Sequence, residues 1–296
     1  MAQLLHYMEL NRMVYGSGQP LVTGTMLKNL DVPALTRDEQ ERVAGAFDDT
    51  NALIKNLELM IAKKRAIKQG MMQQLLTGKI RLPGFSDPWR EQAFSEVSTM
   101  KGRIGWQGLT QDEFTNNAHE PFLITGMNFR DGAIDWASVY HVPEDRYELA
   151  PEIQLKTGDV LMTKDGTIGK LLFVDTIPAP GRATLNSHLL VFRPISNSYD
   201  PRFLYYQLAS PRFAQHIELH KSGSTFFGIS QESVGKYQVL LPPLPEQEAI
   251  SEVLRDADIE LELLGQRLRK AQLLKQGMMQ QLLTGRTRLA IPEATV

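Results

Sequence analysis

Apolar residues recur at alternating steps of four and three positions in two long stretches of the chain. The first seam runs from Val43 to Leu75, and the second runs from Ile250 to Leu282. This spacing keeps apolar side chains on one side of an α-helix and is typical of coiled coils. It predicts two helices of about 40 residues, each roughly 60 Å long, that pair as an antiparallel coiled coil. The residues expected in this seam are Phe47, Ile54, Leu57, Ile61, Met71, Leu75, Leu254, Leu261, Leu264, Leu268, Met278 and Leu282.

The ends of both stretches carry residues that start and stop helices. Thr36, followed three positions later by Glu39, resembles a capping box at the start of the first helix. Pro245 suits the first turn of the second helix, where its missing N–H group is tolerated. Gly78 and Gly285 are natural helix ends, because glycine readily adopts the left-handed conformation there.

The second stretch repeats part of the first without change. The eleven residues Lys68–Gly78 occur again as Lys275–Gly285, 207 positions later. Both copies contain a glycine inside the predicted helix, Gly70 and Gly277, where glycine costs about 1 kcal/mol relative to alanine. Its presence in both copies indicates either a close approach of two backbones or a shared ancestor.

The same offset extends upstream and sets the expected domain organisation. Residues 1–33 align with residues 208–240, so the chain reads as one repeat unit that is preceded by the end of another. The predicted segments are a C-terminal remnant of a first domain at 1–33, a long helix at 34–83, a complete domain at 84–241, a second long helix at 242–289 and a tail at 290–296.

The segment between the two helices has a different amino-acid pattern. Residues 89–241 contain all three tryptophans, scattered glycines and short β-branched or aromatic runs that end at turn residues. We predict strands at 160–163, 170–174 and 189–192, turns at 165–166 and 179–181, and short helices at 201–208 and 211–220. The expected fold class is therefore α+β, a β-rich domain flanked by two long helices.

Composition and charge narrow the functional classes. The net charge is −2, and residues 89–241 hold 14 Lys and Arg against 17 Asp and Glu, so no basic run marks a nucleic-acid binder. A local cationic face formed by folding would still allow DNA contacts. The chain has no cysteine, no signal-peptide pattern and no apolar stretch that approaches a membrane span. We expect a cytoplasmic protein without membrane association.

Several loops combine basic, hydroxyl and amide side chains that suit contacts with phosphates and base edges. The loop Asp165–Lys170 lacks the spacing of a nucleotide-binding P-loop, so it is either a strand-connecting turn or a DNA-facing loop. The loop Lys221–Thr225 and the turn Leu185–His188 leave the same two readings open, since such groups also satisfy local backbone atoms. The candidate DNA-binding residues are Lys101, Arg103, Arg130, Lys164, Thr167, Lys170, Asn186, His188, Lys221, Ser222, Ser224 and Thr225.

No motif predicts catalysis or metal binding on this chain. His216 and His220 share one helical face at a metal-like spacing, but no cysteine or carboxylate cluster accompanies them. Methyltransferase, Walker A and nuclease motifs are not found in the sequence. We therefore expect no catalytic residue, no metal ligand and no cofactor on this chain.

The order of these motifs resembles one family. Long repeated helices bracket a β-rich domain, and Leu240–Gln247, with its Leu-Pro-x-Leu-x-Glu-Gln pattern, precedes the second of them. Lys156–Leu161, Asp165–Gly169, Gly223–Thr225 with Ile229 and Ser230, and the Leu-Leu-Thr-Gly helix ends complete the set. The chain resembles the specificity (S) subunit of type I restriction-modification systems, in a shortened form with one complete target recognition domain.

This resemblance implies a non-catalytic chain that reads part of a double-stranded DNA sequence. It also implies that the paired helices hold recognition domains apart and dock methyltransferase (modification) subunits, and through them the restriction/translocase subunits. S-adenosylmethionine, ATP and Mg²⁺ would then belong to those partner subunits. A second recognition domain would come from another specificity chain or from a second copy of this chain in a homodimer.

Two other functions stay open at this point. The chain could be a scaffold or decoy that binds methyltransferase subunits without reading DNA. It could also be the specificity chain of a type II system in which one partner carries both modification and cleavage. The residues do not identify the bases read, because DNA shape also contributes to recognition.

Overall fold

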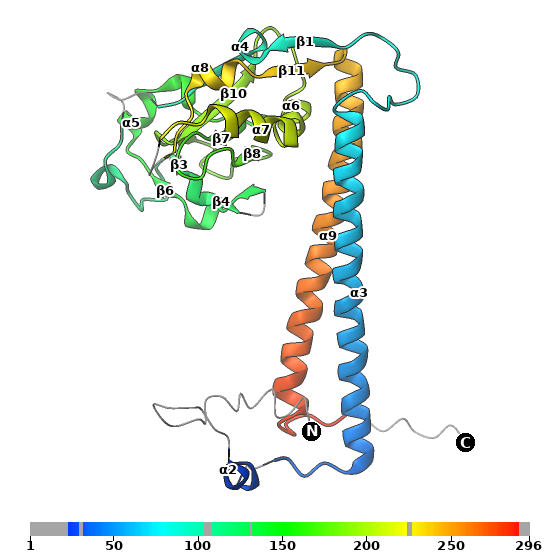
Figure 1. Ribbon diagram of the computed structural model, residues 1–296. Helices are drawn as coiled ribbons and strands as arrows, with labels where there is room; N and C mark the ends of the chain where they lie inside the picture. The colour runs from blue at the N-terminus through cyan, green and yellow to red at the C-terminus, as the bar shows by residue number, and fades with distance from the viewer. Residues whose placement is uncertain (1–22, 30–31, 104–107, 131, 224–226, 290–296) are drawn as a thin grey trace. The chain divides into compact units, whose positions relative to one another are not determined.

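The computed structural model describes residues 23–29, 32–103, 108–130, 132–223 and 227–289 (Figure 1). The contacts divide the chain into two compact units, and each unit contains part of both long helices. The first unit comprises residues 1–67 and 257–296, and the second comprises residues 68–256. The predicted recognition domain at 84–241 lies within the second unit, whose limits fall inside the helices rather than at their ends.

Both long helices are present and begin and end at equivalent positions of the repeat. Helix α3 spans Arg37–Leu75 and helix α9 spans Leu244–Leu282, 39 residues each, at the same offset of 207 that relates the sequence copies. The capping box is confirmed, because the Thr36 backbone N–H donates to Glu39 Oε2 at 2.8 Å and the Glu39 N–H donates to Thr36 Oγ1 at 3.3 Å. Just beyond the helices, Gly78 and Gly285 have φ angles of 68° and 70°, as expected for helix ends.

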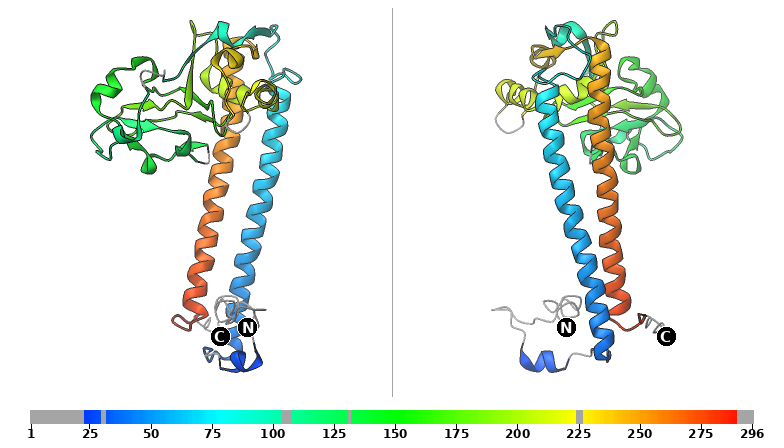
Figure 2. Two further views of the ribbon diagram at one scale, coloured as in Figure 1. Left: turned by 60° about the vertical axis from the view of Figure 1, so that its left-hand side comes forward. Right: turned by 90° about the vertical axis from the view of Figure 1, so that its right-hand side faces the viewer.

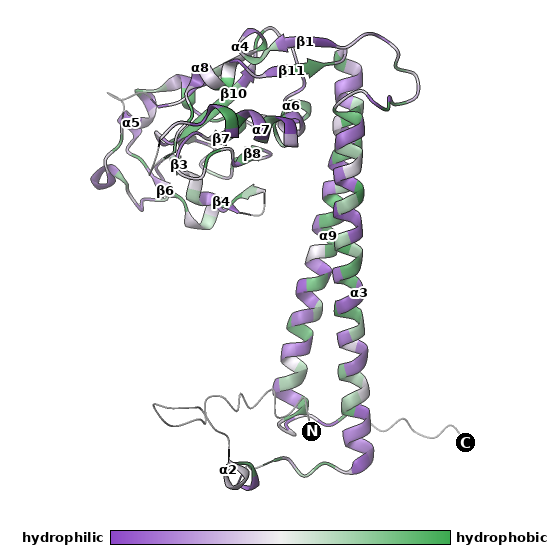
Figure 3. Ribbon diagram, viewed as in Figure 1, coloured by the Kyte–Doolittle hydropathy of each residue, from purple (hydrophilic) through white to green (hydrophobic). Residues whose placement is uncertain are grey.

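In the first unit the two helices pair through the predicted seam. Figure 2 shows α3 and α9 side by side and running in opposite directions. Every predicted seam position is buried or half-buried. Met71, Leu75 and Leu254 lie in the second unit, where they pack in or against the core of the mixed domain. Two apolar clusters hold them together, one around Leu57, Ile61, Leu264 and Ala271, the other around Val43, Phe47, Leu282 and Leu283. Hydrophilic residues alternate with these apolar ones along both helices (Figure 3). The helix pair is therefore amphipathic, and none of the helices in the described ranges is long and apolar enough to cross a membrane.

Neither long helix approaches another backbone at its internal glycine. A Cβ atom built on Gly70 or Gly277 would meet no other atom within 4 Å. The close backbone approach inferred from the sequence is therefore wrong, and shared ancestry accounts for the glycine in both copies. Replacing either glycine with alanine would meet no steric obstacle.

The second unit is built on short strands in four sheets. The largest sheet has the order β2-β10-β7-β8, with all neighbours antiparallel. A three-stranded sheet has the order β6-β3-β9, in which β3 and β9 are parallel. Strands β1 and β11 pair antiparallel, as do β4 and β5. The strands are β1 Arg90–Ala93, β2 Ser98–Lys101, β3 Phe122–Ile124, β4 Phe129–Arg130, β5 Ala133–Ile134, β6 Tyr140–His141, β7 Val160–Thr163, β8 Leu171–Phe173, β9 Ala183–Leu185, β10 Leu189–Pro194 and β11 Gln238–Leu241.

The central strands of the largest sheet are buried on both faces. Along β7, Val160 and Met162 belong to one core, whereas Leu161 between them belongs to another. Successive strand residues point to opposite faces, so this alternation places a hydrophobic core on each side of the sheet. One core contains residues of the short helices α6 (Pro201–Leu208) and α7 (Pro211–His220), and the other contains residues of the three-stranded sheet. This explains why β7 and β10 read as continuous apolar runs in the sequence.

Short helices complete both units. Helices α6 and α7 span the predicted ranges. The three predicted strands correspond to β7, β8 and β10. The short helix α2 lies at the position that corresponds to α8 in the repeat, so the described part of residues 1–33 follows the predicted alignment. The short α-helices are α2 Gly24–Lys28, α4 Phe94–Val97, α5 Glu144–Glu148, α6 Pro201–Leu208, α7 Pro211–His220 and α8 Gln231–Gly235.

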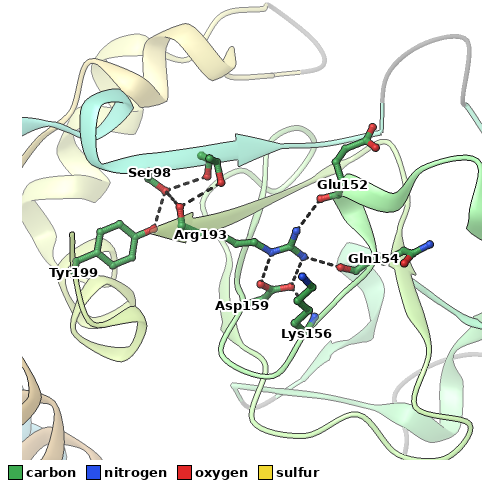
Figure 4. A network of polar contacts seen from close by, with 8 residues as sticks. Ser98, Glu152, Gln154, Lys156, Asp159, Arg193 and Tyr199 are labelled. Carbon is green, nitrogen blue, oxygen red and sulfur yellow. Dashed lines mark hydrogen bonds and ion pairs between the residues drawn. The ribbon is translucent and has the colours of Figure 1, made fainter. Parts of the chain in front are cut away.

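An ion pair between Arg193 and the buried Asp159 connects strand β10 of the largest sheet to the segment that precedes β7 (Figure 4). Arg193 on β10 binds both carboxylate oxygens of Asp159, each at 2.7 Å, and Asp159 is only 4% exposed. The same guanidinium donates to the backbone carbonyls of Glu152 and Gln154 at 2.9 and 2.6 Å. Because these four hydrogen bonds go to acceptors within residues 152–159, Arg193 fixes that segment against the sheet.

An ion pair also joins the end of one long helix to the start of the other, and it occurs twice. In the second unit, Arg81 donates to both carboxylate oxygens of the fully buried Glu246, at 2.5 and 2.6 Å. In the first unit, the equivalent residues of the repeat also form an ion pair, with Arg288 3.2 Å from one carboxylate oxygen of Glu39. The sequence repeat is thus a structural repeat in which each helix start is anchored by the other helix's end.

Candidate nucleic-acid interface

The predicted loop after β7 is a tight turn between β7 and β8. The Thr163 hydroxyl donates to the Thr167 carbonyl at 2.5 Å and accepts from the Lys170 backbone N–H at 3.0 Å. Gly166 and Gly169 have positive φ angles of 65° and 79°, which only glycine adopts readily. The strand-connecting reading of this loop is therefore confirmed, and the turn also presents Thr167 and Lys170 as exposed side chains.

Backbone pairing brings the other predicted loops to the same edge of the domain. The Lys164 N–H donates to the His188 carbonyl at 2.9 Å, and the Gly166 N–H donates to the Phe227 carbonyl at 3.1 Å. Ser222 and Gly228 exchange two backbone hydrogen bonds of 2.9 Å. Residues that are far apart in the sequence thus form one surface through main-chain contacts that do not depend on side-chain identity.

The β4–β5 hairpin, the β7–β8 turn and the turn before β10 border an open pocket of about 830 Å³. Five of the predicted DNA-contact residues line it, namely Arg130, Thr167, Lys170, Asn186 and His188. They come from the β4–β5 hairpin, the β7–β8 turn and the turn before β10. The sequence identified the residues on these three loops, and folding brings them together.

The charges at the pocket are partly neutralised within the domain. His188 Nδ1 donates to Asp165 Oδ1 at 2.6 Å, and Arg130 is 3.0 Å from Asp135. Lys170 is exposed and has no ion pair among the described residues. The lining therefore offers one unpaired cation, one arginine in an exposed pair, and an imidazole whose Nδ1 proton is fixed by a carboxylate.

Arg103 must be removed from the candidate contacts. Its side chain is only 2% exposed, and it donates to the Leu185 carbonyl at 2.9 Å and to Thr184 Oγ1 at 3.1 Å. Burial, and to a lesser extent the nearby charge of Arg146, lowers the pKa of the Arg103 guanidinium to about 10. The prediction that Arg103 contacts DNA is wrong, because its guanidinium is buried and hydrogen-bonded to the end of β9.

The remaining candidates are not part of the pocket lining or fall outside the described residues. Lys101 is exposed on β2, Lys164 is half-buried and Ser222 is exposed. Lys221 forms a 2.6 Å ion pair with Glu218 and lies 4.9 Å from the ring centre of Phe227. None of these four lines the pocket. Ser224 and Thr225 fall outside the described residues.

No sequence pattern predicts the apolar part of the pocket. Met127, Phe114 and Tyr140 line it, and the rings of Phe114 and Tyr140 lie 5.4 Å apart. Thr125 and Asn128 complete this side of the lining. A lone methionine or tyrosine in a loop is ordinary in sequence, so only the fold identifies these residues as neighbours of the cationic loops.

The histidine pair on α7 is engaged in local contacts. His216 Nε2 donates to the Ser233 carbonyl at 2.8 Å, and His220 Nδ1 donates to the His216 carbonyl at 2.8 Å. No group of three or more metal-binding side chains occurs in the part of the chain that the structure describes. The two rings stack 4.1 Å apart, which is a packing role for this spacing.

Comparisons with known proteins relate this fold to one family. The model of the type I restriction modification DNA specificity domain matches residues 105–273. The type I restriction enzyme MjaVIII specificity subunit of Methanocaldococcus jannaschii is 25% identical over 287 residues, which cover 93% of this chain and 66% of the relative. The putative type I restriction enzyme MjaX specificity subunit of the same organism is 23% identical over 280 residues, with coverages of 92% and 62%. The chain thus spans about two thirds of the length of these relatives.

A solved structure shares the fold. The S subunit of a type I restriction-modification system from M. genitalium superposes with a TM-score of 0.64 at 13% sequence identity. The superposition covers 95% of this chain and 72% of that one. At this level of identity the likeness establishes a common architecture of long helices and a mixed domain, and it assigns no role to individual residues.

Proposed function

The chain belongs to the family of type I restriction-modification DNA specificity proteins, and from this premise we propose that it reads DNA sequence for a restriction-modification complex. It carries no chemistry itself in this proposal. Adenine methylation from S-adenosylmethionine, and DNA translocation and cleavage that use ATP and Mg²⁺, are assigned to partner subunits.

The observation that carries the DNA-reading role is the convergence of three loops on one pocket. Lys170 and Arg130 supply cations for phosphates, whereas Asn186, His188 and Thr167 supply groups that suit base edges. A protein of net charge −2 needs such a local surface, because its overall field does not attract DNA. We propose double-stranded DNA as the ligand of this face.

The helix repeat supports a second part of the proposal, the docking of two copies of one partner. Glu39–Glu41 and Lys68–Gly78 are identical in both copies, whereas between residues 42 and 67 only Asp49, Leu57 and Lys63 are unchanged. The unchanged glutamines Gln69, Gln73 and Gln74, and their counterparts Gln276, Gln280 and Gln281, are all exposed. Packing gives no reason for such side chains to stay identical while buried seam residues changed. We therefore propose that each unit offers the same surface to a methyltransferase subunit.

Sequencing of methylated bases tests the DNA-reading role directly. The full chain is co-expressed with the methyltransferase subunit of its own genome in a host that lacks other adenine methylation. We expect methylation at one defined sequence, which Asn186→Ala together with His188→Ala changes or relaxes while the subunits still co-purify. Co-purification without methylation at any defined sequence would favour a scaffold or decoy function instead.

The same co-expression tests the two docking surfaces. Gln73→Glu changes the exposed surface in the second unit, and Gln280→Glu makes the equivalent change in the first. We expect each single variant to reduce the number of bound methyltransferase subunits from two to one, as measured by native mass spectrometry. Unchanged stoichiometry in the double variant would overturn this part of the proposal.

A further inference from the structure

One strongly exposed side chain in the pocket lining is apolar. Met127 has 86% of its surface exposed, although it lies in a folded segment between β3 and β4. Single exposed apolar residues are common on protein surfaces and carry no meaning by themselves. Its place matters here, because the pocket that it lines is also lined by Arg130, Lys170 and His188.

The backbone that carries Met127 is held firmly from both sides. Thr125 caps the short helix Gly126–Asn128, since its hydroxyl accepts from the Met127 N–H at 3.3 Å and its N–H donates to Asn128 Oδ1 at 2.8 Å. Asn128 is buried, and its side-chain amide donates to the Ser138 carbonyl at 3.0 Å.

Close packing adds to this rigidity. A Cβ atom on Gly126 would lie 2.9 Å from the Thr163 methyl group, so the turn sits tightly against the end of β7. The fold therefore holds the backbone of Met127 in place while its thioether side chain projects into solvent.

The surroundings of Met127 match what DNA presents to an inserted side chain. Lys170 and Arg130 flank the pocket and suit phosphates, and Tyr140, which is 46% exposed, offers a ring beside Phe114. Aromatic faces of this kind accept unstacked bases, and apolar wedges such as methionine enter base steps between phosphate contacts.

We propose that Met127 is a wedge that inserts at a base step of the bound DNA and is a specificity-determining residue of this chain. This inference rests on the proposed DNA-reading function and names one residue within it. Partial unstacking costs least at flexible pyrimidine–purine steps, so Met127 selects sequence through DNA deformability, without hydrogen bonds to bases.

The test uses the full chain with its methyltransferase subunit and a duplex that carries the methylated sequence identified above. Met127→Ala is expected to weaken binding to this duplex by about tenfold or more, because the apolar contact is lost. Its binding to an unrelated duplex should not change. Met127→Leu retains an apolar wedge and should restore most of the specific affinity.

Two further measurements separate a wedge from a surface contact. 2-Aminopurine placed singly along the duplex, away from the adenine that the methyltransferase flips out, should brighten at one step when the wild-type complex binds, and should stay dim with Met127→Ala. Lys170→Met is the matched control. Loss of a phosphate contact should weaken binding to both duplexes equally and should leave the fluorescence change of the specific duplex in place.

The outcomes distinguish this inference from the function on which it rests. If the wild-type complex binds both duplexes equally, the DNA-reading function fails. If it binds its own sequence tightly and Met127→Ala changes neither affinity nor fluorescence, only the wedge fails. Loss of co-purifying methyltransferase in Met127→Ala would also overturn the wedge, because Met127 would then contact that subunit.

Discussion

Two basic residues that are neighbours in the sequence have opposite environments in the fold. Lys101 is exposed on β2, whereas Arg103 is buried and donates hydrogen bonds to the end of β9. The local sequence around them is glycine-rich and polar, and it predicts an exposed loop for both. The burial of Arg103 depends on β9, more than 80 positions away, so no local pattern indicates it.

Replacement of Arg103 should therefore affect stability. Arg103→Met leaves the Leu185 carbonyl and the Thr184 hydroxyl without this donor, and we expect a loss of about 1–3 kcal/mol in the free energy of unfolding. Urea unfolding followed by tryptophan fluorescence measures it, because all three tryptophans lie within residues 89–241. Lys101→Met, the exposed control, should change stability by less than about 0.5 kcal/mol. Equal stability of the two variants would contradict this role.

A half-buried histidine should make the second unit sensitive to mild acid. Burial among Phe213 and Tyr237 lowers the pKa of His216 below 6.5, and the charge of His220 lowers it further, although the hydrogen bond to Ser233 opposes the shift. The unfolded chain then binds this proton more readily than the folded chain, so stability falls as the pH drops through about 6.5.

The pH dependence of the midpoint of urea unfolding checks this expectation. Between about pH 7 and pH 5.5 the wild-type chain should lose more stability than His216→Gln. The exposed His119→Gln provides the matched control and should keep the wild-type slope. Parallel curves for the wild type and His216→Gln would show that this ring does not titrate with folding.

At the scale of elements, prediction succeeded where local signals and long-range packing agree. The long helices were set by caps, seam and repeat, and β7 and β10 are buried on both faces, so continuous apolar runs reveal them. By contrast, the polar strand β1 was missed, because it forms through pairing with β11 at the far end of the domain. Strands β3, β6 and β9 have two or three residues each, too few for a pattern to show.

The duplicated ion pair gives a matched comparison between the two helix starts. Glu246 is fully buried, accepts two bonds from Arg81 and also accepts from Trp89 Nε1 at 3.2 Å. Glu39 is partly exposed and pairs with Arg288. Breaking a buried pair leaves an uncompensated charge, whereas an exposed pair is screened by water.

Hydrogen exchange at the two helix starts should reveal this difference. We expect Glu246→Gln to lose much of the wild-type amide protection in the first turns of α9. The same substitution at Glu39 should cause a smaller loss in the first turns of α3. Each helix serves as the internal control for the other. Equal losses at both starts would mean that burial does not set the strength of this contact.

For the whole molecule, the sequence identified the family and the repeat, but the pocket appears only after folding. Its cations come from the β4–β5 hairpin, the β7–β8 turn and the turn before β10, and the overall charge is slightly negative. Two of its basic groups are already paired with Asp135 and Asp165. A DNA complex of this chain should therefore rely on few phosphate contacts.

The salt dependence of DNA binding counts those contacts. If Arg130 and Lys170, the arginine and lysine that line the pocket, each neutralise one phosphate, the logarithm of the binding constant should fall against the logarithm of salt concentration with a slope of about −2. Fluorescence anisotropy with the full complex and its own duplex measures this slope, and the methyltransferase subunit alone gives the contribution to subtract. Lys170→Met should make the slope shallower by about one, because one counterion fewer is released. Lys101→Met, outside the pocket, should leave it unchanged. An equal change in both variants would mean that DNA contacts a broad basic surface rather than the pocket. If DNA binds only at the pocket, Lys170 contributes to the slope and Lys101 does not.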